Sequence, residues 1–370
     1  MRLKSLRYRE NIAREDANPW ELQEIHLGEH NLIVAKNATG KTRILNTLHN
    51  LSRLIQASQT MVNGVPQKIT SEGEWHASFI DENHSVFEYF VAFKNGQVAH
   101  ERITVDSQEK LKREMSSAEI YSNSTSKWQK ISPPNDQLVL HVRRDKNEFP
   151  FLESLISWAK GVRGLSFGNT SPYVIEIPGK PSQLTSLNAV PSALEQLSTS
   201  QLQNVLEQLR SIGYGLEAAT TGLAEGLPPS TKIIFLKEAG INHPLKQNEI
   251  SHGMFRAFSL LTIVEFFRTS GDVGCILIDD FGEGLDFERV KKLSELIFCK
   301  KSEPNLQIVA TSNDSFLMNA VPLHDLTLCY RSNHTVSGLN YANSREKFDE
   351  WRQLGLNNFD LFSSDFLQKT

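Results

Sequence analysis

Apolar and polar residues alternate with two different periods along the chain, and this pattern predicts both strands and helices. Short apolar runs near the N-terminus predict strands, and a segment with Ile44, Leu48 and Leu51 at helical spacing follows them. Beyond this segment, strict alternation and an Asn95-Gly96 turn predict an antiparallel lobe. The predicted strands are 3–8, 20–26, 31–34, 75–80, 86–93 and 98–105, and the predicted helix is 42–54.

The middle of the chain has a weaker pattern. Residues 106–136 are rich in Ser, Lys, Gln and Asn and show no period, which predicts a mobile loop. Its basic residues leave a nucleic-acid contact open beside a solvated, charged loop; they are Lys110, Lys112, Arg113, Lys127 and Lys130. The next predicted elements are a strand at 137–142, a helix at 151–162, an apolar run at 173–177, a helix at 191–209 and a hairpin of 232–236 and 241–245.

The last third of the chain alternates helix and buried strand again, which favours parallel pairing. The predicted elements are a helix at 254–267, a strand at 273–278, a second strand from 308 and a short helix at 344–354. The segment 356–367 carries apolar residues. Docking of a partner and packing on its own domain both remain open for this segment.

An octapeptide with the spacing of a phosphate-binding loop joins the strand at 31–34 to the helix at 42–54. Its residues are Ala35-Lys36-Asn37-Ala38-Thr39-Gly40-Lys41-Thr42, with alanine where the motif has its first glycine. Backbone N–H groups at a helix N-terminus bind phosphate oxygens, and Lys41 adds a positive charge. The Thr42 hydroxyl can ligate Mg²⁺. The alternative is an ordinary strand–helix turn with a solvated lysine.

Two acidic residues end the buried strand at 273–278. Asp279 is suited to holding Mg²⁺, and Asp280 is suited to orienting or deprotonating an attacking water. An apolar strand that presents acids at its C-terminal end directs them into a cleft. An acidic turn without a ligand is the alternative, and the phosphate loop makes it less favourable.

Three further segments resemble motifs of ABC-type ATPases. Asp279-Asp280-Phe281-Gly282-Glu283-Gly284-Leu285-Asp286 is similar to their Walker B and D-loop, and Ile250-Ser251-His252-Gly253-Met254-Phe255-Arg256 to their signature. The segment 308–317 resembles their switch strand. The form Ser-x-Gly-x-x-Arg is most similar to SMC-like and OLD-like bacterial AAA ATPases. A transporter subunit is disfavoured by this form and by the middle region.

This resemblance implies an α/β fold: an ABC/SMC-like P-loop NTPase head with a mixed sheet, an antiparallel β lobe and a helical insertion lobe. The expected parts are the N-terminal half of the head at 1–105, the insertion lobe at 106–230, the C-terminal half at 231–340 and a tail at 341–370. In this superfamily two subunits enclose two nucleotides head to tail. The resemblance therefore implies that Ser251 and Gly253 meet the γ phosphate of ATP bound to a second copy, although Ser251 also suits a plain helix cap.

The chain departs from the family pattern around the γ phosphate. Ala35 and Ala38 replace glycines, Asp280 replaces the usual glutamate, and Asn313 replaces the usual switch histidine. The shorter carboxylate reaches less far, and an amide carries no proton to transfer. We therefore expect ATP binding with slow hydrolysis, and a scaffold that never hydrolyses stays open. The expected catalytic residues are Lys41, Asp280 and Asn313; the nucleotide-binding residues are Ala35, Lys36, Asn37, Ala38, Thr39, Gly40, Lys41, Thr42, Arg43, Ser251 and Gly253; and the metal ligands are Thr42 and Asp279.

Composition limits the function that these motifs serve. The 370 residues carry a net charge of −4, which argues against general attraction to nucleic acid or an anionic membrane. Three cysteines without metal-ligand spacing, no export signal and no membrane span predict a cytoplasmic protein. The resemblance implies an ATP-dependent homodimer or higher oligomer that gates a separate effector, such as a nuclease or toxin, in anti-phage defence. The alternative is a DNA-repair ATPase of the RecF and SMC kind that clamps DNA.

Overall fold

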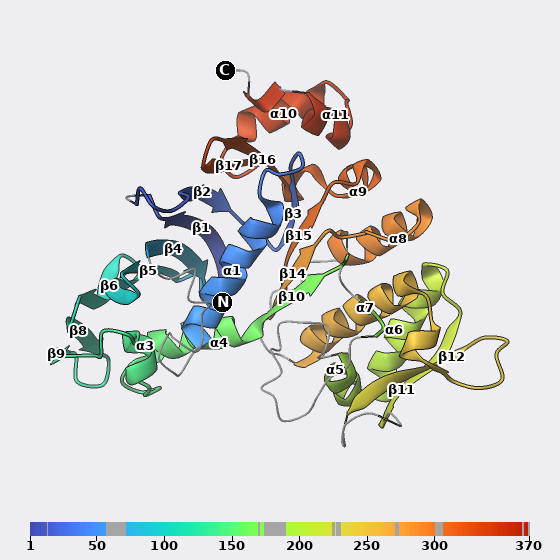
Figure 1. Cartoon of the computed structure of the whole chain (residues 1–370), viewed down its shortest axis with the longest axis horizontal. Helices are drawn as coiled ribbons and strands as arrows, with labels where there is room; N and C mark the ends of the chain where they lie inside the picture. The colour runs from blue at the N-terminus through green and yellow to red at the C-terminus, as the bar shows by residue number, and fades with distance from the viewer. Residues whose placement is uncertain are drawn as a thin grey trace. The chain divides into compact units, whose positions relative to one another are not determined.

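The computed structural model describes residues 1–12, 14–56, 72–168, 171–173, 190–223, 226, 231–270, 274–299, 306–364 and 366–368. They belong to two units (Figure 1). The first unit comprises Met1–Asn31, Ala35–Val162 and Thr327–Glu350, and the second comprises Leu32–Val34, Arg163–Leu326 and Trp351–Thr370. Among the described helices, none is both long and apolar enough to cross a membrane.

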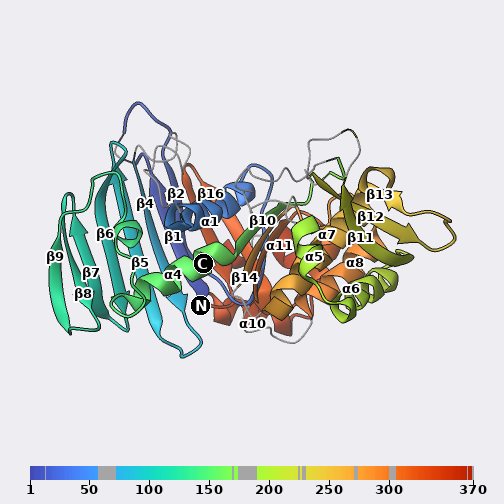
Figure 2. The same cartoon turned by 90° about the horizontal axis from the view of Figure 1, so that it is seen from below.

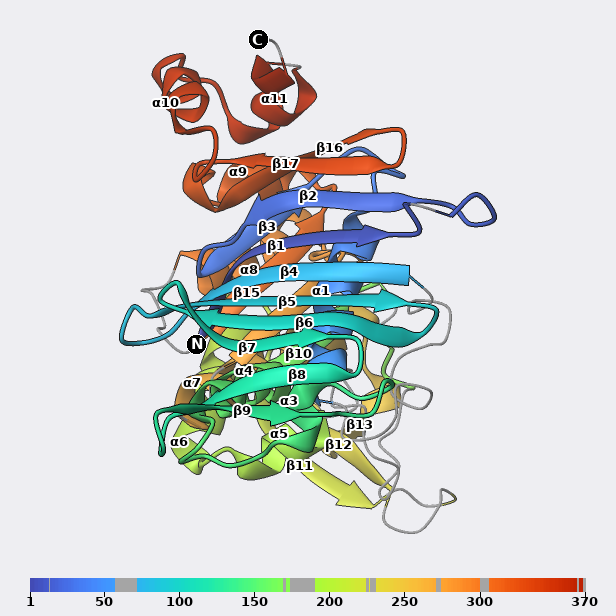
Figure 3. The same cartoon turned by 90° about the vertical axis from the view of Figure 1, so that its left-hand side faces the viewer.

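The first unit is built on a mostly antiparallel sheet, and Figure 3 shows its strands in order. Its order is β16-β17-β2-β1-β4-β5-β6-β7-β8-β9, and β17 pairs with β2 in parallel. Residues alternate between buried and exposed positions along β4, as expected for a sheet with one covered face. The strands are β1 (Arg2–Glu10), β2 (Trp20–His26), β4 (Glu72–Ile80), β5 (Val86–Lys94), β6 (Gln97–Val105), β7 (Gln108–Glu114), β8 (Ser117–Ser122), β9 (Lys127–Ile131), β16 (Leu326–Ser332) and β17 (Thr335–Asn340).

Helices cover one part of this sheet. They are α1 (Lys41–Gln56), α3 (Val139–Val142) and α4 (Pro150–Gly161). Helices α1 and α4 lie side by side (Figure 2), and the Gln56 side-chain amide donates to the Ala159 carbonyl at 2.6 Å. Trp158 packs edge-on against Phe79 of β4, with ring centroids 4.7 Å apart. Helix α4 is therefore anchored on a buried aromatic side chain of the sheet, and α1 is hydrogen-bonded to α4.

The second unit has a parallel core, as the predicted alternation of helix and strand requires. Its strand order is β10-β14-β15-β3, and β14 pairs with β15 in parallel. Helix α7 is buried around almost its whole circumference, and α5 and α6 pack against it (Figure 1). The elements are β3 (His30–Val34), β10 (Val162–Ser166), α5 (Val190–Gln196), α6 (Thr199–Ser211), α7 (His252–Ser270), β14 (Gly274–Asp279), α8 (Phe287–Phe298), β15 (Leu306–Ser312) and α9 (Ser315–Ala320).

The remaining elements of the chain are short. A separate three-stranded sheet has the order β11-β12-β13. Near the C-terminus, Asn358 of α11 donates to the carbonyls of Met318 and Val321, each at 2.8 Å, so this part of the tail packs on its own unit. The elements are β11 (Leu216–Leu223), β12 (Lys232–Glu238), β13 (Leu245–Lys246), η2 (Gln247–Glu249), η3 (Leu323–Asp325), α10 (Arg345–Gln353), α11 (Asn358–Ser363) and η4 (Phe366–Gln368).

The prediction of a mobile loop at 106–136 was wrong, because β7, β8 and β9 extend the antiparallel sheet through this segment. Their turns place Asp106, Ser107 and Met115 at positive φ, so neither glycine nor proline marks them. Strands near the edge of a sheet also bury few residues, and a polar pattern hides their period.

A buried ionic cluster holds the same lobe together. The Glu101 carboxylate accepts from the Tyr89 hydroxyl at 3.3 Å and from the Val139 backbone N–H at 2.7 Å, and burial raises the pKa of Glu101 to about 7. Arg113 donates to the carbonyls of Met115 at 2.7 Å and Pro134 at 2.8 Å. Arg113, which the sequence placed in a basic loop, is therefore enclosed in the lobe and unavailable to a nucleic acid.

Three other predicted elements were also wrong in kind or extent. The segment 137–142 is not a strand: Val139–Val142 forms one helical turn, since a short buried apolar run does not distinguish the two. The helix at 191–209 is two helices, which Ser198 separates with a capping box to Gln201. The second hairpin strand is Leu245–Lys246 rather than 241–245. Residues 174–177 and Val273 lie outside the described residues.

Candidate nucleotide-binding site

The phosphate loop leads from β3 into α1, which begins at Lys41. Ala35 is buried, whereas Lys36, Asn37 and Ala38 are exposed. Ala38 has φ +64° and Gly40 has φ +111°, so the backbone takes the left-handed region twice within three residues. An L-residue there costs about 1–2 kcal/mol, so Ala38 holds a loop conformation that glycine adopts more easily.

Lys41 lies inside the loop that it follows. Its side chain is largely buried, and its ammonium group donates to the Ala35 carbonyl at 3.3 Å. This hydrogen bond holds the Lys41 ammonium group beside the first residue of the loop. Thr42, the next residue, is exposed in the first turn of α1, where its hydroxyl is accessible to a ligand. Both positions suit the phosphate and metal roles that the sequence predicts for them.

Arg331 is a contact of this loop that the sequence did not predict. It lies on β16, 293 residues from Ala38, and its guanidinium donates to the Ala38 carbonyl at 3.1 Å. It also donates to the carbonyl of Asn333 at 2.8 Å in the turn to β17. Arg331 therefore holds the strained residue of the loop and places a cation beside it. No local pattern indicates it, because the contact depends on how β16 is placed in the sheet.

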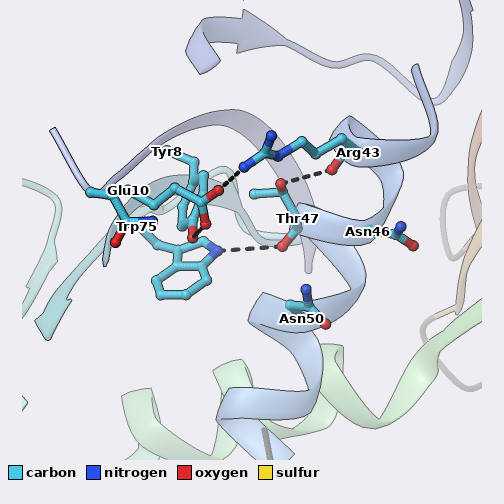
Figure 4. A pocket seen from close by; sticks show the side chains of 8 residues that line it. Tyr8, Glu10, Arg43, Asn46, Thr47, Asn50 and Trp75 are labelled. Atoms are coloured by element: carbon cyan, nitrogen blue, oxygen red, sulfur yellow. Dashed lines mark hydrogen bonds and ion pairs between the residues drawn. The ribbon is translucent and has the colours of Figure 1, made fainter. Parts of the chain in front are cut away.

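Arg43 does not offer an uncompensated charge. Its guanidinium forms an ion pair with Glu10 (Figure 4). It also stacks on the Trp20 ring, with the guanidinium carbon 4.4 Å from the ring centroid. Burial lowers the pKa of Arg43 from its usual value, and the nearby Arg331 acts in the same direction. If Arg43 contributes to nucleotide binding as predicted, its shape and hydrogen bonds suit that role better than its charge, which Glu10 already compensates.

The two predicted carboxylates stand together in the second unit, at the end of β14. Thr311 of β15 joins them: its hydroxyl donates to Asp279 Oδ1 at 2.7 Å and accepts from the Asp280 backbone N–H at 3.0 Å. Asp280 has φ +53°, a conformation that is uncommon outside glycine and asparagine. This backbone geometry turns the chain sharply after the strand, and such strain clusters at functional sites.

The oxygen atoms near Asp279 match the ligand preference of a magnesium ion. The groups there are carboxylate and hydroxyl oxygens, which are the ligands that Mg²⁺ prefers. Within the described ranges, no group of three or more His, Cys, Asp or Glu side chains is arranged to hold a metal. The carboxylate and hydroxyl oxygens at Asp279 and Thr311 are of the kind that Mg²⁺ takes when phosphate and water complete its shell.

The signature segment packs on the turn that follows β14. The Ser251 hydroxyl accepts from the Met254 backbone N–H at 3.2 Å and so caps α7, while its side chain stays exposed. A Cβ on Gly253 would stand 3.0 Å from a Leu285 side-chain carbon and 3.1 Å from the Gly284 carbonyl. A side chain at residue 253 would therefore need its neighbours to shift by a few tenths of an ångström. The capping interpretation of Ser251 is correct, and its exposed side chain is still accessible to a ligand.

Arg256 fixes the same turn. It is part of the signature segment, and the sequence predicted no role for it. Its guanidinium donates to the Glu283 carbonyl and to the Gly168 carbonyl, each at 2.6 Å. Gly284 has φ +78°, and a Cβ there would lie 2.3 Å from the Arg256 Nη1 atom. Asn313 is exposed directly after β15, next to the Asp314 that caps α9. Thus the structure gathers Asp279, Asp280 and Asn313 near one strand end and packs Gly253 against the following turn.

Comparison with known proteins agrees with this arrangement. A family model described as "AAA domain, putative AbiEii toxin, Type IV TA system" matches residues 31–319, and the chain belongs to this family. No curated protein sequence matches the chain.

Three solved structures of SMC heads are similar to this chain. An SMC head bound to the C-terminal winged-helix domain of ScpA is 14% identical, with a TM-score of 0.53 over 92% of this chain and 97% of that chain. The SMC head domain from Thermotoga maritima is 14% identical, with a TM-score of 0.45 over 92% and 99%. A Pyrococcus furiosus SMC head with an extended coiled coil is 12% identical, with a TM-score of 0.46 over 95% and 99%. The first likeness confirms the predicted fold, an SMC-like head of the ABC-type P-loop NTPase class.

Proposed function

We propose that this chain binds ATP with Mg²⁺ and hydrolyses it slowly to ADP and phosphate. The observation that carries the proposal is the loop from Ala35 to Thr42, which combines two left-handed residues, an inward lysine and the start of a long helix. This is the combination of backbone N–H groups, helix dipole and point charge that binds phosphates. Residues 35–43 bind the nucleotide in this proposal, and its Lys41 charge stabilises the transferring phosphoryl group.

The proposed metal ligands are Thr42 and Asp279. Bound Mg²⁺ would neutralise phosphate charge during transfer. Thr311 keeps one oxygen of Asp279 in a hydrogen bond, which orients the carboxylate toward a ligand on its other oxygen. Asp280 is the proposed base for the attacking water and Asn313 its hydrogen-bond partner. Asp280 is one methylene shorter than glutamate and Asn313 cannot transfer a proton, which supports slow turnover.

The proposal includes a second copy of the chain. Ser251 is exposed at the N-terminus of α7, where a helix dipole favours an anion, and Gly253 holds that turn in place. We propose that these two residues face the γ phosphate of ATP on a partner subunit, so that ATP joins a homodimer. Membership in the AAA family and the SMC-like fold support this association.

The proposed role of that dimer is to gate a separate effector, such as a nuclease or toxin, in bacterial anti-phage defence. The printed family description, "putative AbiEii toxin, Type IV TA system", supports the defence setting of this proposal. The charges of the β lobe weigh against a DNA clamp. Lys112 pairs with Glu114 at 3.8 Å and Lys130 with Glu119 at 3.7 Å, so two of the basic residues are compensated by acids on the same strands or the next.

Purified protein with ATP and Mg²⁺ tests the catalytic part of the proposal. We expect saturable binding and a turnover well below the ~1–10³ s⁻¹ of typical enzymes. A turnover of tens per second would contradict the slow-hydrolysis account. Light scattering with and without ATP tests the dimer, and an unchanged monomer mass at saturating ATP would exclude it. Steep salt-dependent DNA binding that requires ATP would favour the clamp over the effector gate.

A further inference from the structure

The antiparallel sheet of the first unit ends in an edge strand, β9, which Figure 2 shows at the outer end of the sheet. This strand pairs with β8 from Ala118↔Ile131 to Ser122↔Lys127. Among the described residues, no strand pairs with the other side of β9. The backbone N–H and C=O groups on that side therefore form a row of hydrogen-bonding groups for a further strand.

An exposed aromatic residue lies at this edge. Trp128 is 45% exposed, whereas the other four tryptophans of the chain are at most 3% exposed. The Trp128 ring packs against Tyr121 of β8, with centroids 5.8 Å apart, and the Lys110 ammonium of β7 lies 4.4 Å from the Tyr121 centroid. One cation and two aromatic rings thus form a row that crosses the last three strands and ends at the open edge.

Two lysines of β9 limit what can pair with it. They are Lys127 and Lys130, and both are exposed. Lysines on an edge strand usually discourage pairing with another sheet, because like charges directly opposite one another are destabilising. A strand that pairs with β9 must therefore place a residue other than lysine opposite each of them.

A second copy of β9 meets this requirement in an antiparallel pair. We consider a two-fold axis that is perpendicular to the sheet and passes through Gln129. Trp128 then lies opposite the partner subunit's Lys130, and Lys127 lies opposite the partner subunit's Ile131. Each lysine faces an apolar side chain, and all five residues of the strand are paired. The sequence of β9 is thus complementary to itself in this register.

Neighbouring registers lose this property. Paired side chains must lie on the same face of the sheet, so the axis can move only from one residue to another. An axis through Lys130 would place this lysine opposite its own copy. An axis through Trp128 would bring Ser126 into the pairing, and Ser126 lies in the β8–β9 turn with φ +54°. The register centred on Gln129 is therefore favoured.

We propose that β9 pairs with β9 of a second copy of this chain, so that the two sheets become continuous. The lysine at residue 130 of each copy lies over the Trp128 ring of the other, which is a cation–π contact. The row of Lys110, Tyr121 and Trp128 thereby extends into the partner.

This association is separate from the proposed ATP-joined dimer. It needs no nucleotide, and it uses neither Ser251 nor Gly253. A pair of five-residue strands is a small interface, so we expect a dissociation constant on the order of 10–100 µM. A chain that uses both contacts forms assemblies larger than a dimer.

Sedimentation of the nucleotide-free protein from about 1 to 500 µM, a range that spans this dissociation constant, tests the proposal. We expect the mass to rise from monomer to dimer. Ile131→Lys places a lysine opposite Lys127 twice across the axis, and it should weaken the dimer about tenfold. Adding Lys127→Glu turns both like-charged pairs into opposite-charged pairs, so the affinity should return to within about threefold of the wild-type value. Gln97→Lys, at an exposed position of β6, is the control and should change nothing.

Fluorescence reports on the same edge. Because Trp128 is the exposed tryptophan, iodide quenching should decrease as the dimer forms, and Trp128→Phe should remove this dependence on concentration. If Ile131→Lys does not fold, Gln129→Glu and Gln129→Lys replace it. Residue 129 faces its own copy, so each variant alone should associate more weakly than the wild-type protein. An equimolar mixture of the two should associate more tightly than either.

Three results would overturn the proposal. The first is a monomer at every concentration without nucleotide. The second is a dimer that Ile131→Lys leaves intact, and the third is a folded double variant that associates as weakly as Ile131→Lys, since another surface would then join the copies. None of these results bears on ATP binding, which Lys41→Ala tests separately.

Discussion

The phosphate loop of the first unit and the carboxylate corner of the second unit are held in place by different means. Ala38 of the loop depends on a guanidinium from a strand 293 residues away, and its N–H groups come from the backbone. The corner at Asp279 and Asp280 depends on Thr311 of the neighbouring parallel strand. The loop supplies binding and the corner supplies turnover in our proposal, so mutations should change these two properties separately.

We expect Thr311→Val to separate turnover from ATP affinity most strongly. The change keeps the side-chain shape but removes the hydroxyl that orients Asp279 and receives the Asp280 N–H. Loss of such a supporting hydrogen bond typically costs about 10–100-fold in activity. We expect turnover to fall by about this factor with ATP affinity unchanged, as measured by phosphate release and by calorimetry. An equal loss of affinity would break the separation between loop and corner.

The second prediction concerns the stability of the turn after the carboxylate corner, not its activity. Gly284→Ala places a Cβ 2.3 Å from the Arg256 guanidinium at a residue with φ +78°. We expect the free energy of unfolding to fall by about 2 kcal/mol, from the backbone strain and the displaced arginine together. Denaturant unfolding measures it. Gly240→Ala is the control, because Gly240 has φ +80° with no atom within 4 Å of the new Cβ. Equal losses in both variants would show that Arg256 adds nothing.

The smallest expected effect is on the loop. Arg331→Ala removes one charge-assisted hydrogen bond to Ala38, and we expect ATP affinity to fall about fivefold with the turnover of bound ATP unchanged. Arg102→Ala removes an arginine of similar exposure that pairs with Glu109 in the β lobe, and it should leave affinity intact. Matching losses in the two variants would point to a general charge effect in place of the contact with Ala38.

Contiguous motifs explain which parts of this molecule the sequence predicted. The strand before Ala35, the helix after Lys41 and the strand before Asp279 each have their period, turn and polar residues within a short window. The β7–β9 strands were missed because their turns lack glycine and proline and because Arg113 is buried by contacts with carbonyls far along the chain.

The positions of Thr311 and Arg331 could not be predicted for a similar reason. Each contacts its target through the pairing of strands or through the placing of a hairpin, and neither has a local signature.

The most direct test of the account compares Lys41→Ala with Asp280→Ala in one binding and turnover assay with ATP and Mg²⁺. The account predicts that Lys41→Ala loses ATP binding by two orders of magnitude or more, since it removes the buried ammonium that we propose binds the phosphates. Asp280→Ala should bind ATP as tightly as the wild-type protein and retain it without releasing phosphate. Full ATP affinity in Lys41→Ala, or normal turnover in Asp280→Ala, would contradict it.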